Sequence, residues 1–137
     1  MRWEHFAHDA DLGIRGRGAT PDEAFAAAGL AVTAAVTDPG AVRDVETVEL
    51  DCPGTDRELL LYDWLNALIY TMATRQSVYG HCEVTLGPGG LHARLSGEPI
   101  DRVRHAPAVE PKGATLTGLC VRQAADGEWC AECVIDT

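Results

Sequence analysis

The sequence predicts an α+β fold in which two helices and a mainly antiparallel sheet form a two-layer sandwich. Two segments carry helix start signals followed by apolar residues at intervals of three and four. The predicted strands follow one another in hairpins, without the regular strand-helix alternation of a parallel sheet. The chain has 137 residues, so we expect one domain that spans residues 1–137.

Both helices are predicted from capping-box spacing. Thr20 and Glu23 start the first helix, which we expect to continue to about Thr37. Thr55 and Glu58 repeat this spacing before the second, longer helix. That helix carries one apolar stripe for the core, formed by Leu61, Trp64, Leu65, Leu68 and Met72.

The strands are predicted from alternating apolar and polar residues and from turn residues between them. The first two expected strands are residues 3–7 and 12–18. The others are expected at residues 42–50, 82–86, 91–95, 114–123 and 129–135. Residues 100–111 are predicted to form an irregular polar loop.

The net charge argues against direct binding of nucleic acid. Eleven basic and 21 acidic residues give a formal charge of −10, which repels a phosphate backbone. The same charge suits solubility, cation binding or a basic partner, and it does not rank these three. We expect a cytoplasmic protein without membrane contact, because the sequence has neither a signal-peptide core nor an apolar run of about 20 residues.

The five cysteines cannot all pair with one another, which fits reduced thiols. Cys130 and Cys133 form a C-x-x-C motif inside a predicted strand. An offset of three residues in a strand directs two side chains to opposite faces. The motif therefore does not favour a shared zinc or redox site.

Carboxylates at predicted strand ends suggest a cation site. Asp11 lies between the first two strands, and Asp136 follows the last one, next to Thr137 with its carboxyl group. Hard cations bind to several such oxygens. Taken alone, the stretch His8-Asp9-Ala10-Asp11 is more often a turn with solvated acids.

The stretch His8-Asp9-Ala10-Asp11-Leu12-Gly13 resembles the opening H-x-A-D-(I/L)-G of the archease family. Further segments resemble family motifs in the same order, namely residues 20–25, 36–38, 60–65, 110–115 and 134–137. The resemblance covers essentially the whole chain. Departures occur at Ala7, where the family commonly has Asp, at residues 72–75, and at Leu116 and Thr117.

This resemblance implies an activator and not an enzyme, so no catalytic residue is expected. Archeases assist RtcB-type RNA ligases by promoting guanylylation and repeated turnover in transfer-RNA splicing or RNA repair. The family's metal ligands map onto Asp11, Asp136 and Thr137, for a divalent cation such as calcium, magnesium or manganese. Functional or partner-contacting roles are expected for His8, Asp38, His105, Glu110 and Lys112.

Two alternatives to the accessory role remain open from the sequence. The first is a stand-alone metal-dependent hydrolase or phosphoryl-transfer enzyme that uses His8 or His105 as the acid or base. The second is a cation-binding domain with a purely structural role. Activity of the isolated protein on nucleotides or phosphoesters would favour the enzyme.

Overall fold

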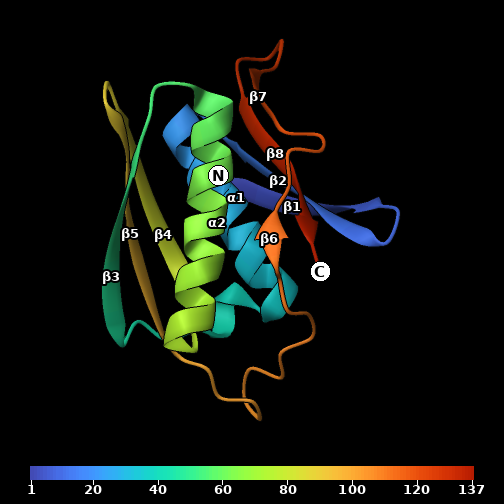
Figure 1. Ribbon diagram of the computed structural model, residues 1–137, viewed down its shortest axis with the longest axis vertical. Helices are drawn as coiled ribbons and strands as arrows, with labels where there is room; N and C mark the ends of the chain where they lie inside the picture. The colour runs from blue at the N-terminus through green and yellow to red at the C-terminus, as the bar shows by residue number, and fades with distance from the viewer.

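The computed structural model describes residues 1–137 and divides eight strands between two antiparallel sheets, with the helices between them (Figure 1). One sheet has the order β1 (Arg2–His8), β2 (Asp11–Gly18), β8 (Trp129–Asp136) and β6 (Gly113–Ala114), and β7 (Cys120–Gln123) also pairs with β8. The other sheet has the order β3 (Glu46–Pro53), β5 (Gly90–Pro99) and β4 (Ser77–Gly87). The helices are α1 (Pro21–Val36), α2 (Arg57–Arg75) and the short 3-10 turn η1 (Pro39–Ala41).

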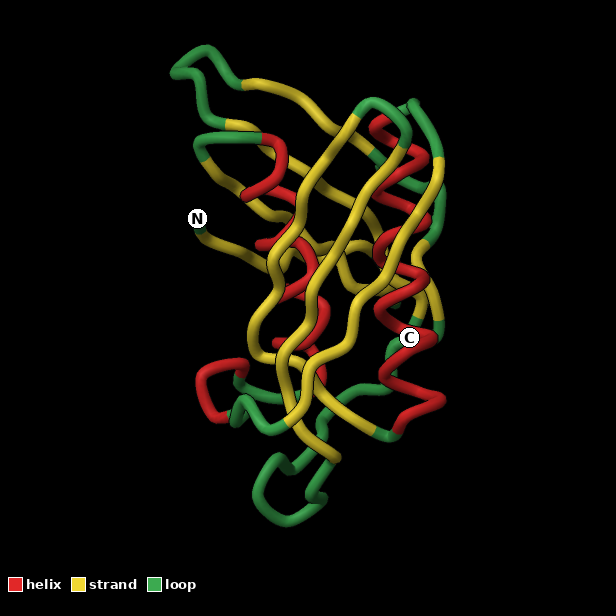
Figure 2. The backbone as a smooth tube through the Cα atoms, turned by 90° about the vertical axis from the view of Figure 1, so that its left-hand side faces the viewer, coloured by secondary structure: helices red, strands yellow, loops and turns green.

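The structure confirms the α+β class, the two helices and the antiparallel pairing. The division of the strands into two sheets was not predicted, because it depends on pairing between distant segments such as β2 and β8. The three-stranded sheet covers one side of the helices, and no helix or strand covers its outer face (Figure 2). No helix combines the length and the apolar character needed to cross a bilayer.

Three predicted boundaries were wrong for local reasons. The strand expected from residue 42 begins at Glu46, because Asp38 caps η1 by accepting a 3.0 Å hydrogen bond from the Gly40 N–H. The strand expected over residues 114–123 is interrupted between β6 and β7, where Gly118 adopts a φ of 64°. The cap of α2 is Asp56 and not Thr55, since the Asp56 carboxylate accepts from the Leu59 N–H at 3.0 Å.

Helix α1 packs directly against the backbone of β2. A Cβ atom at Gly16 would lie 2.2 Å from the Ala24 carbonyl oxygen and 2.3 Å from the Ala28 nitrogen. Only glycine permits this approach of strand to helix. On another side of α1, the fully buried Trp64 of α2 donates a 3.0 Å hydrogen bond to the Phe25 carbonyl. Helix α1 is thus held between a strand and the second helix.

This contact predicts that Gly16→Ala is strongly destabilising. The added methyl group meets backbone atoms of α1, which cannot move without displacing the helix, so we expect a loss of about 3 kcal/mol in the free energy of unfolding. Urea denaturation measures this loss. Gly89→Ala is the matched control, because a Cβ there meets nothing within 4 Å and we expect a change below about 0.5 kcal/mol. Equal stability of the two variants would refute the close approach.

Candidate functional site

Two carboxylates from opposite ends of the chain lie at one end of the five-stranded sheet. The last residue pair between β2 and β8 joins Leu12 to Ile135. Asp11 precedes Leu12 and Asp136 follows Ile135, so the two aspartates occupy the next positions on adjacent strands. By alternation along each strand, both lie on the face opposite the buried Ile135. We call this end of the sheet the strand-end site.

His8 belongs to the same site through the β1–β2 hairpin. It pairs with Asp11 across a tight turn in which Asp9 has a φ of 51°, a backbone conformation that aspartate tolerates better than most residues. The Nδ1 atom of His8 is buried and has no hydrogen-bond partner in the protein. Buried polar atoms are normally paired, so this nitrogen lacks the internal partner that such an atom usually has.

Lys112 reaches the site from the opposite side of β8. Its backbone N–H donates a 2.8 Å hydrogen bond to the Asp136 carbonyl, directly before Gly113 pairs with Asp136 in the sheet. The Lys112 side chain is exposed and forms no ion pair. Thr137 is also exposed and follows Asp136. The site therefore combines carboxylates, one unpaired imidazole nitrogen and one free ammonium group.

The oxygen ligands available at the strand-end site are of the type that a hard divalent cation binds. Asp11 and Asp136 offer carboxylate oxygens, the ligands preferred by calcium, magnesium and manganese. No three His, Cys, Asp or Glu side chains in the chain are grouped closely enough to hold a metal ion by themselves. A complete site here therefore requires further oxygens, from Thr137, from main-chain carbonyls or from water.

His105 belongs to a different cluster, built around the carboxylate of Glu98, whereas Asp38 is exposed and caps η1 beside that cluster. His105 is 4% exposed, and both of its ring nitrogens are engaged: Nδ1 accepts from the Asp101 N–H at 2.8 Å, and Nε2 donates to Glu98 at 3.1 Å. The hydroxyl of Thr37, the neighbour of Asp38, donates to the His105 carbonyl at 2.7 Å. These contacts tie the loop after β5 to the end of α1.

Glu98 is 5% exposed and is compensated on every side. Arg104 donates to it, the Arg43 backbone N–H donates at 2.7 Å, and His105 supplies a third hydrogen bond. These donors, with Arg104 contributing most, lower the pKa of Glu98 to about 2 from its ordinary value of 4.5. The sequence analysis did not identify Glu98, because nothing in the local pattern shows that a glutamate at a strand end becomes buried.

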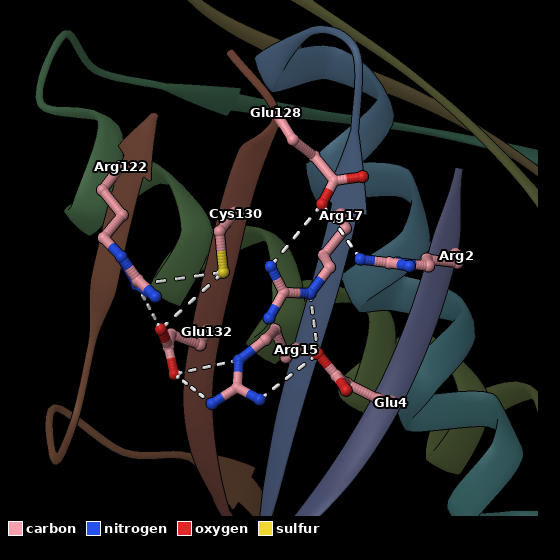
Figure 3. Close-up of polar contacts among 8 residues, drawn as sticks. All are labelled: Arg2, Glu4, Arg15, Arg17, Arg122, Glu128, Cys130 and Glu132. Atoms are coloured by element: carbon pink, nitrogen blue, oxygen red, sulfur yellow. Dashed lines mark hydrogen bonds and ion pairs between the residues drawn. The ribbon is translucent and has the colours of Figure 1, made fainter. Parts of the chain in front are cut away.

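The five-stranded sheet also has an outer face, the one turned away from α1. Away from the strand-end site, this face is covered by charged side chains that pair with one another (Figure 3). Arg15 bonds to Glu132 at 2.9 Å and to Glu4 at 3.3 Å, and Arg17 bonds to Glu4 at 2.7 Å. The pKa of Glu4 is lowered, chiefly by the hydrogen bond from Arg17. The thiol of Cys130 points toward Glu132 on this face, whereas the Cys133 thiol donates to the Thr115 carbonyl at 3.1 Å. The two cysteines therefore make separate contacts, as the strand alternation predicts.

Comparison with known proteins identifies the family. The Archease protein family matches residues 3–137. The chain belongs to the archease family. It is 33% identical to the protein archease of Pyrococcus furiosus and 34% identical to that of Thermococcus gammatolerans, with 98% of each chain covered in both comparisons.

Solved structures agree with this assignment. The solution structure of Methanobacterium thermoautotrophicum protein 1598 superposes with a TM-score of 0.81 at 28% identity, covering 98% of both chains. An archease from Thermotoga maritima, described as a possible chaperone, has a TM-score of 0.67 at 18% identity, covering 100% of this chain and 98% of that one. This second similarity concerns the fold alone. The resemblance seen in the motifs is thus confirmed at the level of the family.

The Glu98 cluster makes the stability of this archease sensitive to acid. The pKa of Glu98 is lower in the folded protein than in the unfolded chain, so its contribution is complete above pH 4.5 and is lost as the pH falls toward 2. We expect Glu98→Gln to remove this part of the pH dependence, reducing proton uptake on unfolding in that range by up to about one proton. Urea denaturation at a series of pH values measures the slope. Glu83→Gln, an exposed glutamate on β4, should leave the slope unchanged.

Proposed function

We propose that this archease is a metal-binding accessory protein of an RtcB-type RNA ligase. It promotes guanylylation and multiple turnover of the ligase during transfer-RNA splicing or RNA repair in the cytoplasm. The observation that carries the proposal is the juxtaposition of Asp11, Asp136 and Lys112 at the strand-end site in a chain of the archease family. These residues lie far apart in sequence and meet only in the fold.

The proposed ligands are Asp11, Asp136 and Thr137. His8, whose Nδ1 atom is unpaired, is the partner of Asp11 in the β1–β2 hairpin. A divalent cation held there supplies positive charge for the anionic oxygens of a nucleotide. Lys112 adds a second, exposed positive charge on the neighbouring segment. The charged side chains of this site form no ion pairs within the protein. They are therefore suited to contact the reaction centre of another protein.

The environment of His105 counts against a stand-alone enzyme that uses it as acid or base. Both ring nitrogens are occupied inside the protein and the side chain is buried, so a substrate cannot reach them without opening the Glu98 cluster. His105 is better explained as a residue that shapes the loop between β5 and β6, and Asp38 as the cap of η1. Glu110 is exposed on that loop, close in sequence to Lys112.

The metal-centred proposal predicts that Asp11→Asn and Asp136→Asn each weaken binding of calcium or manganese by about tenfold or more, because each loses one charged oxygen ligand. Stimulation of ligase guanylylation should fall in parallel. Isothermal titration and a guanylylation assay measure the two effects, with circular dichroism to confirm folding. Asp126→Asn, in the turn at the other end of β8, is the control and should behave like the parent. Full stimulation by Asp136→Asn would exclude the proposed metal ligands.

The isolated archease should not bind transfer RNA tightly. Its charge of −10 opposes the phosphate backbone. Most arginines on the outer face of the five-stranded sheet are already paired with glutamates. We expect a dissociation constant above about 100 μM at physiological salt in a fluorescence anisotropy titration. Tight binding that weakens steeply with added salt would contradict this expectation and would favour direct contact with RNA.

A further inference from the structure

The segment that carries Lys112 enters the five-stranded sheet through a very short strand. Strand β6 spans only Gly113–Ala114 and pairs with β8. Directly before it, the Lys112 N–H donates to the Asp136 carbonyl at 2.8 Å. Directly after it, the Thr115 N–H donates to the Val134 carbonyl at 2.9 Å. Because β8 occupies only one edge of β6, the main-chain groups on the other edge need a different partner.

The side chain of Asn66 on α2 serves the second edge of β6. Its Oδ1 atom accepts a 2.9 Å hydrogen bond from the Ala114 N–H. Ala114 is 8% exposed, so without Asn66 this buried N–H would have no partner in the protein. Gly113 leaves room for the contact, because a Cβ atom there would crowd the same oxygen at 3.2 Å. Asn66 thus stands where the carbonyl of a neighbouring strand would otherwise lie.

The orientation of the Asn66 amide is fixed by its own helix. The Nδ2 atom donates a 3.2 Å hydrogen bond to the Tyr62 carbonyl, one turn earlier in α2. A side-chain amide donates through its nitrogen and accepts through its oxygen, so these two partners together require Oδ1 to face β6. The amide is therefore a preset link between α2 and the short strand.

The helix itself does not need an asparagine at this position. Asparagine favours helix formation less than leucine does, and the apolar core stripe of α2 is formed by other residues. Of the two hydrogen bonds that Asn66 makes, only the one to Ala114 leaves α2. The structural effect of this side chain therefore falls on β6.

The path of β6 in turn decides where Lys112 lies. The Lys112 side chain is exposed, so its place beside Asp136 follows from the course of the main chain. That main chain arrives from the irregular loop after β5 and is anchored to β8 on one edge and to α2 on the other (Figure 1). Loss of the α2 anchor would leave β6 with main-chain bonds on one edge alone.

We propose that Asn66 is a positioning residue, which fastens β6 to α2 and thereby holds Lys112 beside Asp136 at the strand-end site. This inference rests on the proposed function, because it takes Lys112 to act on the ligase. In this role Asn66 contacts neither the cation nor the ligase and acts through the position of Lys112.

Hydrogen exchange tests the link without the ligase. Asn66→Leu keeps the approximate size of the side chain and removes the acceptor, whereas Asn66→Asp keeps an oxygen acceptor. By NMR of the ¹⁵N-labelled chain, we expect the Ala114 amide to exchange about tenfold or more faster in Asn66→Leu and within about threefold of the parent in Asn66→Asp. Thr74→Val is the control, because the Thr74 hydroxyl bonds only within α2, to the Tyr70 carbonyl at 2.9 Å. Unchanged exchange of Ala114 in Asn66→Leu would overturn the inference.

Stimulation of ligase guanylylation tests the consequence of the link. Asn66→Leu and Lys112→Ala should each lower stimulation about tenfold or more, while Asn66→Asp and Thr74→Val should retain it. Adding Asn66→Leu to Lys112→Ala should cause no further loss, because both changes remove the same positioned ammonium group. Calcium affinity of Asn66→Leu, measured by isothermal titration, should stay within about threefold of the parent, since the pairing of β2 with β8 positions Asp11 and Asp136.

The remaining outcomes separate this inference from the proposed function. Additive losses in the double variant would show that Asn66 acts independently of Lys112, and lost calcium binding by Asn66→Leu would show that it acts through the metal ligands; either result would overturn the inference. Parent-like stimulation by Asn66→Leu, with a loss in Lys112→Ala, would do the same and leave the proposed function standing. Parent-like stimulation by both Lys112→Ala and Asp136→Asn would instead remove the proposed function, and with it any functional role for the link.

Discussion

The antiparallel pairing of β2 with β8 is the constraint on which the rest of the structure depends. It joins residues more than a hundred positions apart, from Leu12 with Ile135 to Gly18 with Trp129. Because side chains alternate along a strand, this one register decides which residues of both strands face α1 and which face solvent. Ile14 and Cys133 are fully buried on one face, and Arg15 and Glu132 form an ion pair on the other.

The same register creates the strand-end site without any further structural device. Once Leu12 is opposite Ile135, the flanking aspartates must be neighbours, and the short pairing of β6 with β8 brings Lys112 to them. The site is built on main-chain hydrogen bonds of a sheet. Such a support holds charged side chains close together although they repel one another, which is a condition for binding a cation.

The loop between β5 and β6 joins the buried Glu98 cluster to the strand-end site. At its start the buried Glu98 cluster fixes the path of the chain, and at its end Lys112 enters the sheet. A small pocket of about 200 Å³ lies along this loop, against the end of α2. The side chains of Glu98 and His105 are paired inside the protein, so the contribution of the cluster is to position the loop that leads to Lys112.

The sequence by itself determined the features that depend on neighbours in the chain. The capping box of Thr20, the apolar stripe of α2 and most strands follow from local spacing, and the family follows from motifs spread along the chain. Only the tertiary structure decided which polar residues meet. Asp11 joins Asp136 because of strand register, while His105 joins the unpredicted Glu98, since burial and long-range pairing are set by the packing of both sheets around α1 and leave no signal in the local sequence.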